Sequence, residues 1–384
     1  MTLLTRPVMV TVAGHFGAAF AALCMPPFYA YILQANFSSQ SLTLAGWYFT
    51  LPTLAAAIAN PLWGRLGDRI GRRASLIRAH AGLCLSFILT AMARTPLEFA
   101  LGLTLQGLLG GTFSASNAFL AEQVSASRLS TLLGVMQASA RTALFAGPAL
   151  IGLLSGRANL LHLFFYLALF PAAASLILCL LPDPPAGAQS PAAKAATGSA
   201  GAGDCGVSAA SLYQLQAMFT VGTVLSYPYF IIDLGQRLDI GPATAGLLFG
   251  LPHALFLLLA WPIGRTLRFD NARASLARYA ALTCAGLLLQ LVAGQLAWMV
   301  GGRLLMGVGM TGAYLSINTL AAATTVAATA GRHFGKLEGA NKWGAVGAGL
   351  IASALVAPLG YAAPMWLGCA LLGTLFLVMK WKMT

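Results

Sequence analysis

Charged residues are scarce in this sequence of 384 residues: they make up 8% of the chain, and only 9 residues are acidic. Hydrophobic residues make up 58%, and the mean hydropathy is +0.79. A chain so poor in charge cannot cover a globular core with a polar surface, so this composition excludes a soluble globular protein.

Patterns that hold metals or cofactors are also missing. The six cysteines show no C-x-x-C or zinc-ligand spacing. We find no clustered His/Asp set, no nucleophile elbow and no glycine-rich phosphate loop, which argues against a membrane enzyme. We therefore predict a protein that is not an enzyme and that holds no metal and no cofactor. The first apolar run continues into a predicted span without a clear cleavage site, so we expect no cleavable signal peptide.

Long apolar runs are what the chain does contain. A helix that crosses a bilayer needs about 20 predominantly apolar residues, and twelve runs approach that length. Hydrophobicity within them is continuous rather than alternating, which argues against a β-barrel. The sequence predicts an all-α integral membrane protein of twelve transmembrane helices. The predicted spans are 8–32, 43–63, 75–93, 97–120, 131–154, 161–181, 211–233, 244–263, 275–294, 297–320, 335–357 and 361–380.

Basic residues are distributed asymmetrically between the predicted loops. The net charge of +13 could suggest a nucleic-acid partner, but the basic residues lie mainly in short loops on one side of the bilayer. This is the positive-inside pattern, so we reject nucleic acid and place both termini in the cytoplasm, in a multi-pass protein of the inner membrane. The basic residues predicted outside are Arg94, Arg157 and Arg237.

A segment rich in Ala, Gly, Pro and Ser separates two halves of six predicted spans each. We predict an N-terminal six-helix bundle over 1–181, a flexible cytoplasmic linker over 182–210 and a C-terminal six-helix bundle over 211–384.

The two halves also repeat one another in sequence. Leu51-Pro52 recurs as Leu251-Pro252 and Gly107 recurs as Gly307, all at an offset of 200 residues. Two similar halves around a site near the bilayer midplane form a common transporter arrangement. We therefore expect two pseudo-symmetric bundles that rock about such a site.

Five charges are concentrated between the second and third predicted spans, over residues 64–73. The segment resembles the signature loop of the major facilitator superfamily, with the pattern G-x-L-a-D-r-x-G-r-r. The resemblance implies a secondary transporter that works by alternating access. We expect Asp68 and its arginines to close the cytoplasmic side and to separate when the halves rock; a topology signal is the alternative. The predicted gating residues are Gly64, Asp68, Arg69, Gly71, Arg72 and Arg73.

Two basic residues lie inside predicted spans, where a charge costs about 2.5–3.5 kcal/mol at the bilayer centre. Arg141 follows Gln137 by one helical turn, and Lys342 follows Glu338 by one turn in the other half, beside Asn341. We predict that these two faces bind an anionic substrate in a central cavity. The alternative is that Lys342 pairs with Glu338 or extends to the interface, and that Arg141 bonds backbone carbonyls.

Amides and aromatics in other spans are further candidates for the substrate path. Asn117, Asn318 and Tyr227 are predicted to line it, although packing or an interfacial aromatic belt explains each equally well.

Proton coupling is predicted for His15 and Glu338. An imidazole titrates near neutral pH, but a lone histidine on an apolar helix is more often structural. The family's span-four arginine is absent here, because Leu103 stands in its place; the second half has Arg303 in the equivalent position.

The sequence favours a proton-coupled exporter similar to drug:proton antiporters. Gly147-Pro148 and the residues after it resemble the antiporter G-P-x-x-G-G element, which favours export. We predict a monomer that exports a small anionic or zwitterionic compound, such as a carboxylate siderophore, with H⁺ as the coupling ion. Multidrug efflux is the alternative; an importer or a passive channel has less support.

Overall fold

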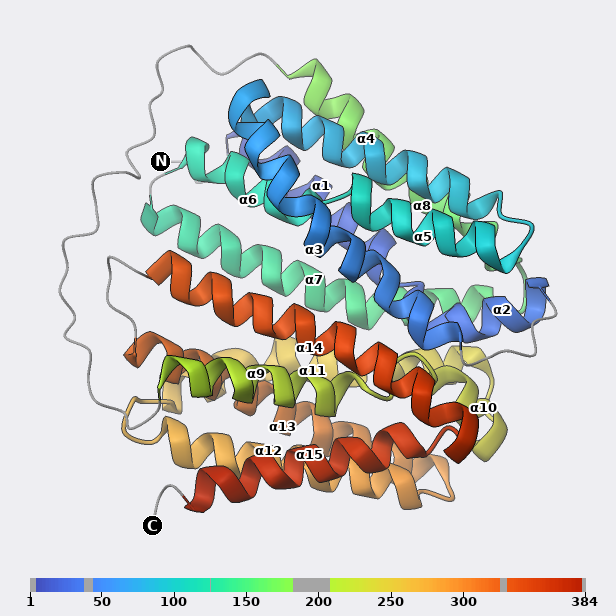
Figure 1. Ribbon diagram of the computed structural model, residues 1–384, viewed down its shortest axis with the longest axis vertical. Helices are drawn as coiled ribbons and strands as arrows, with labels where there is room; N and C mark the ends of the chain where they lie inside the picture. The colour runs from blue at the N-terminus through green and yellow to red at the C-terminus, as the bar shows by residue number, and fades with distance from the viewer. Residues whose placement is uncertain (1–4, 38–43, 125, 182–207, 325–329, 382–384) are drawn as a thin grey trace. The chain divides into compact units, whose positions relative to one another are not determined.

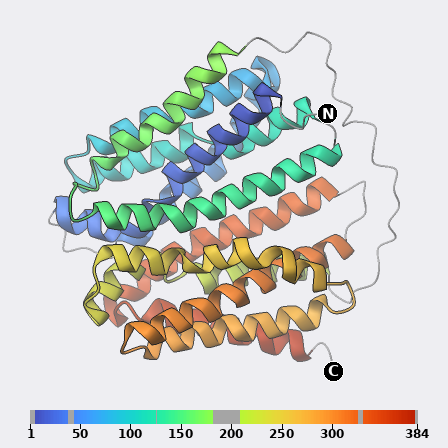
Figure 2. The same cartoon turned by 180° about the vertical axis from the view of Figure 1, so that it is seen from behind.

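The computed structural model describes residues 5–37, 44–124, 126–181, 208–324 and 330–381. Every regular element in these ranges is helical (Figures 1 and 2). The elements are α1 (Arg6–Leu23), the 3₁₀ turn η1 (Pro26–Phe28), α2 (Tyr29–Phe37), α3 (Leu44–Ile70), α4 (Arg72–Ala91), α5 (Pro96–Leu109), α6 (Thr112–Gln123), α7 (Ala126–Leu154), α8 (Leu163–Leu180), α9 (Ala209–Val224), α10 (Phe230–Leu238), α11 (Pro242–Thr266), α12 (Ala272–Val292), α13 (Leu296–Ala323), α14 (Ala330–Leu359) and α15 (Ala363–Trp381).

Each predicted span falls on helical residues, which confirms the all-helical class, but three spans are interrupted. Pro26-Pro27 produces η1, and residues 225–229, which include Pro228, separate α9 from α10. A proline inside a helix removes a backbone hydrogen bond and bends or ends the helix. The break between α5 and α6 was not expected. Gly111 has a φ of +83° there, in the left-handed region that glycine adopts without strain.

These breaks affect how many helices are long enough to cross a bilayer. Within the described residues, eight helical segments are long and apolar enough by length and composition. The twelve predicted spans exceed that number. The elements α5, α6, α9 and α10 are each shorter than 18 residues, and α7 carries Gln137 and Arg141 in its middle.

The chain divides into two compact units. Unit 1 comprises Met1–Leu42 and Leu51–Ala195, and unit 2 comprises Thr43–Thr50 and Ala196–Thr384. The start of α3 thus belongs to unit 2 and its remainder to unit 1. Most of the predicted linker, residues 182–207, lies outside the described residues.

Unit 1 is built around α1 and α4. Helix α4 packs along α8 and α5, and α1 packs against α7 and α8 (Figure 1). Apolar side chains fill the interfaces between them: Leu76 and Phe119 join α4 to α6, and Val8 and Met136 join α1 to α7. These apolar contacts surround a number of buried polar side chains, among them His15 and His80.

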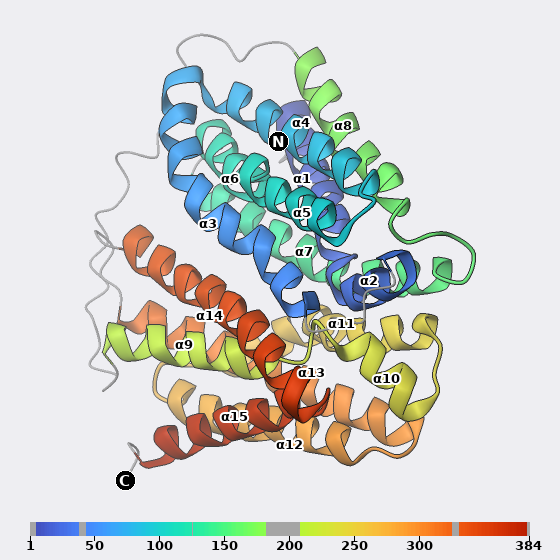
Figure 3. The same ribbon diagram turned by 45° about the vertical axis from the view of Figure 1, so that its right-hand side comes forward.

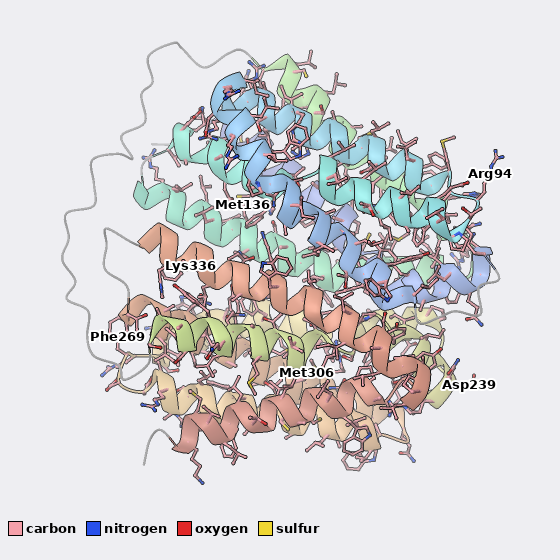
Figure 4. The ribbon with its side chains drawn as sticks, viewed as in Figure 1. Arg94, Met136, Asp239, Phe269, Met306 and Lys336 are labelled. Atoms are coloured by element: carbon pink, nitrogen blue, oxygen red, sulfur yellow. The ribbon has the colours of Figure 1, made fainter. Side chains whose placement is uncertain are left out.

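Unit 2 is built around α12, α13 and α15. Helix α12 packs against both α13 and α15, while α9 packs against α14 (Figure 3). Its core includes Leu276, Met306 and Leu372, all fully buried; Met306 is labelled in Figure 4.

The sequence repeat is also a repeat of packing contacts. A Cβ added at Gly107 would lie 2.1 Å from the carbonyl oxygen of Pro52, and one added at Gly307 would lie 2.9 Å from the Cα of Pro252. Glycine therefore brings the same two helices of each unit together beside the same proline. Residues 200 positions apart in the sequence are thus equivalent in their packing contacts as well as in residue type.

Candidate functional site

A hydrogen-bond network joins α9 and α14 inside unit 2. The hydroxyl of Thr220 donates to Asn341 Oδ1 at 2.8 Å, and Gln216 Nε2 donates to the hydroxyl of Thr220 at 3.0 Å. Gln216 Nε2 also reaches Asn341 Oδ1 at 3.4 Å. The helices approach this closely because Gly344 has no side chain: a Cβ there would lie 2.8 Å from the carbonyl oxygen of Ala217.

Two of the predicted substrate residues extend this network toward a charge. Asn341 Nδ2 donates to Glu338 Oε2 at 3.5 Å, one turn before Lys342, whose side chain is exposed. A carboxylate and an ammonium on one helix face, beside buried amide and hydroxyl groups, can bind a ligand that carries a negative charge and hydrogen-bond donors or acceptors.

The equivalent helix of unit 1 presents a simpler polar face. On α7, Gln137 is exposed and Arg141 is half-buried one turn later, whereas Met136 is fully buried against α1 (labelled in Figure 4). Asn117 lies on α6, and its Oδ1 is buried without a hydrogen-bond partner among the described residues. Unit 1 therefore offers the guanidinium of Arg141. Among its described residues, no hydrogen-bond network corresponds to the one between α9 and α14.

Tyr227 and Asn318 lie away from that network. The ring of Tyr227 meets that of Phe249 edge-to-face, with 4.8 Å between centroids, and its hydroxyl lies 3.5 Å from His253 Nε2. Asn318 Nδ2 donates to the carbonyl of Tyr314 within its own helix. The described contacts thus place both in helix packing.

Gln216 and Thr220 were missed by the sequence reasoning. They are polar residues one turn apart in a predicted apolar span, and that spacing was the available signal.

The signature segment is mostly helix rather than loop. Helix α3 continues to Ile70, and Gly71 alone, with a φ of +91°, makes the turn into α4. Asp68 Oδ1 pairs with Arg72 Nη2 at 2.5 Å, and Arg72 Nε lies 3.5 Å from Glu122 Oε1. The Asp68 side chain is 60% exposed, so this pair contributes little to stability.

Arg73 of this segment and Arg78, further along α4, hold helix ends within unit 1. Arg73 donates through Nη2 to the carbonyls of Leu178, at 2.8 Å, and of Leu181, at the end of α8. Arg78 donates through Nη1 to the carbonyl of Leu109 at 2.7 Å, where α5 ends. Carbonyls at helix ends have no partner inside the helix, and a cation there also interacts favourably with the helix dipole.

The remaining predicted gating residues, Gly64 and Arg69, are exposed. A gating role for these residues stays a prediction.

Known proteins match this arrangement. The sequence profile of the Major Facilitator Superfamily matches residues 9–203, just over half of the chain. The chain belongs to this superfamily. It is therefore a multi-pass membrane protein of a transporter family rather than of an enzyme family.

Individual superfamily members match part of the chain. Multidrug resistance protein MdtG of Salmonella paratyphi C is 34% identical over 180 residues, covering 46% of this chain and 43% of that protein. The Staphyloferrin B transporter of Staphylococcus aureus is 38% identical over 127 residues, covering 33% of this chain and 30% of that protein. The chain thus spans less than half the length of these curated relatives.

Solved structures of superfamily members match along nearly the whole chain. The human organic anion transporter MFSD10 (TETRAN) has a TM-score of 0.70 at 18% identity, covering 97% of this chain and 98% of that one. The POT family transporter PepTSo has a TM-score of 0.75 at 14% identity, covering 99% and 98%. At such identities these likenesses show the major facilitator fold alone.

Arg303 occupies the place in unit 2 where this superfamily member has Leu103 in unit 1. Its side chain is fully buried, and Nε donates to the carbonyl of Leu248 at 2.8 Å. That carbonyl is free because Pro252, four residues later, has no N–H to donate to it. The guanidinium also lies 4.4 Å from the ring of Phe230. These contacts account for the buried charge without a substrate.

Proposed function

We propose that this superfamily member exports a small anionic or zwitterionic organic compound in exchange for protons. The observation that carries the proposal is the α9–α14 network, which ends at Glu338 and the exposed Lys342. Arg141 supplies a second cation from unit 1. Because a charge inside a membrane-spanning helix is costly, residues retained there are functional candidates.

The wider expectations belong to the same proposal. The protein works by alternating access, with twelve helices in two six-helix bundles, as a monomer in the inner membrane with both termini in the cytoplasm. The residues that take part in gating are Gly64, Asp68, Arg69, Gly71, Arg72 and Arg73. A relative named as a transporter of staphyloferrin B supports a metabolite as the cargo.

Export of unknown cargo is tested by comparing culture supernatants by mass spectrometry. Strains would express the wild type, Arg141→Gln or Lys342→Gln. Loss of a charge-assisted hydrogen bond costs about 1.5–3 kcal/mol, which corresponds to about 10–100-fold weaker binding. We expect an anionic compound that depends on the wild-type protein and falls at least about tenfold with either variant.

Lys336→Gln is the matched control, since Lys336 is an exposed lysine on the same helix, labelled in Figure 4. Its strain is expected to export as the wild type does. Unchanged export with both site variants would contradict the anionic site. Uptake of the identified compound into inverted vesicles, with and without a pH gradient, then tests proton coupling.

Multidrug efflux is the second candidate, because matches to MdtG proteins recur among the curated relatives. Resistance to lipophilic cationic dyes, measured in the same strains, separates the two. Dye resistance that persists in Arg141→Gln and Lys342→Gln would favour multidrug efflux.

A further inference from the structure

Two buried histidines lie close together inside unit 1. His15 on α1 is 2% exposed, and His80 on α4 is fully buried. A Cβ added at Gly14, the neighbour of His15, would lie 3.4 Å from His80 Nε2, so the His80 ring contacts α1 beside His15. Because this inference names the coupling residues of the proposed exporter, it rests on the proposed function.

Neither ring has a hydrogen-bond partner. All four ring nitrogens are buried and unpaired among the described residues. The backbone carbonyl of Met136 in α7 is directed toward His15, but without hydrogen-bond geometry. Leaving a buried polar group unpaired costs about 1–3 kcal/mol, so such a group usually marks a bound water, an ion or a functional role.

Two further unpaired polar atoms come from α6. The ring of His15 lies 5.2 Å from that of Phe113, measured between centroids. Ser116 and Asn117 follow Phe113 by three and four residues, so they lie on the same face of α6. Ser116 Oγ and Asn117 Oδ1 are both buried without partners. Buried water typically makes about three hydrogen bonds to such otherwise unpaired groups.

Charged and titratable side chains on the helices packed around the pair form no described hydrogen bond with it. Arg73 and Arg78 bond the ends of α8 and α5, and Glu122 lies beside Arg72. No hydrogen bond among the described residues joins any such group to either imidazole. The groups concerned are Arg6 on α1, Arg72, Arg73, Arg78 and Cys84 on α4, Glu122 on α6, Arg128 and Arg141 on α7, and Tyr166 and Cys179 on α8.

We propose that His15 and His80 bind one proton jointly, through water that Ser116 and Asn117 also hydrogen-bond, and that this is the proton-coupling site of the transporter. In the neutral pair each imidazole carries one N–H and one acceptor nitrogen. An added proton arrives from water on one side of the membrane, is held at one of the two acceptor nitrogens, and leaves to water on the other side. Only one proton binds, because two imidazolium ions this close in an apolar unit repel each other.

The joint titration is tested by NMR of protein labelled with ¹⁵N-histidine. The chain has five histidines, so single substitutions assign the signals. In the wild type the His15 and His80 signals are expected to move over the same pH interval. In His80→Gln the His15 midpoint shifts by about half a pH unit or more. His162→Gln, at an exposed histidine of the same unit, leaves both unchanged.

The proposal is overturned if His15 titrates identically with and without His80, or if neither signal moves between about pH 4 and 9. If His80→Gln does not fold, the wild-type protein alone still tests the proposal. Independent titration midpoints for His15 and His80, or signals that do not shift with pH, would contradict it. This measurement needs no substrate, so its result remains valid even if the protein proves not to export the proposed compound.

Transport supplies a readout that a purely structural role would not change. In proteoliposomes loaded with the compound identified from supernatants, His15→Gln and His80→Gln are expected to retain substrate exchange but to lose accumulation driven by a pH gradient. Accumulation at the wild-type level in both variants would also overturn the proposal. Absence of any transport by the wild type would count against the proposed function instead.

Discussion

Replacing Gly107 with alanine tests whether close helix packing stabilises unit 1. The added Cβ would lie 2.1 Å from the Pro52 carbonyl oxygen, 2.7 Å from Ala55 Cβ and 2.9 Å from the backbone nitrogen of Ala56. Favourable contacts between carbon atoms require about 3.5–4.0 Å. Because two of the three atoms belong to the backbone, rotamer changes cannot relieve the overlap, and α5 must move away from α3.

The expected cost follows from these distances. Overpacking a well-packed site costs about 1–3 kcal/mol, and we expect Gly107→Ala at the upper end of that range. In Gly307→Ala the nearest atom is Leu255 Cδ1 at 2.7 Å, the mobile end of a side chain, and the backbone Cα of Pro252 lies at 2.9 Å. Because side-chain movement relieves only the first of these overlaps, we expect a smaller cost of about 1–2 kcal/mol. The two halves, although related by the repeat, should therefore respond unequally.

Gly134 and Gly335 provide matched controls from the same repeat. Neither has an atom within 4 Å of an added Cβ. Alanine in place of glycine within a helix is favoured by about 0.5–1 kcal/mol, so these variants should be neutral or slightly more stable.

Thermal unfolding in detergent measures all four variants. For a unit of this size 1 kcal/mol corresponds to about 2–4 °C, so Gly107→Ala should lower the Tm by about 6–12 °C. The reasoning fails if Gly134→Ala lowers the Tm as much as Gly107→Ala, or if Gly107→Ala leaves it unchanged.

Two further predictions concern polar contacts of unit 2. Asp233 accepts a hydrogen bond from Arg237 at 3.0 Å and is almost fully buried. Asp233→Asn should therefore lower the free energy of unfolding by about 3–5 kcal/mol, measured by denaturant titration. A change below about 1 kcal/mol would show that the pair is not effectively buried. Thr220→Val removes the hydroxyl that donates to Asn341 and should weaken substrate binding about tenfold in a transport assay. Thr223→Val, one turn away and bonded only to backbone carbonyls, is its control, and equal losses in both would contradict a site at Asn341.

Local composition predicted most of the helices. Apolar runs mark where helices lie, and prolines mark where helices bend or end. Each of these signals depends only on residues close together in the sequence. The break at Gly111 was missed because a left-handed glycine leaves no signal beyond the glycine itself.

The candidate sites were harder to predict because they depend on distant partners. Glu338 and Asn341 were identified as unusual for their span, yet Thr220, which pairs with Asn341, lies more than a hundred residues earlier. His80 was not identified at all, since its significance comes from a neighbour on another helix. For Arg73, the partners at the end of α8 also lie more than a hundred residues away in the sequence, so nothing in the local sequence indicates them.

The bond from Arg303 to the carbonyl freed by Pro252 makes the two related halves mechanically unlike. In unit 2 the Arg303 guanidinium on α13 hydrogen-bonds to α11 beside Pro252. Apolar surroundings strengthen this hydrogen bond because water cannot compete for the carbonyl. Unit 1 has Pro52 at the equivalent place, but Leu103 stands at the position of Arg303 and cannot donate such a bond. The Arg303 bond therefore resists separation of α11 and α13 in unit 2, a restraint that Leu103 cannot provide in unit 1.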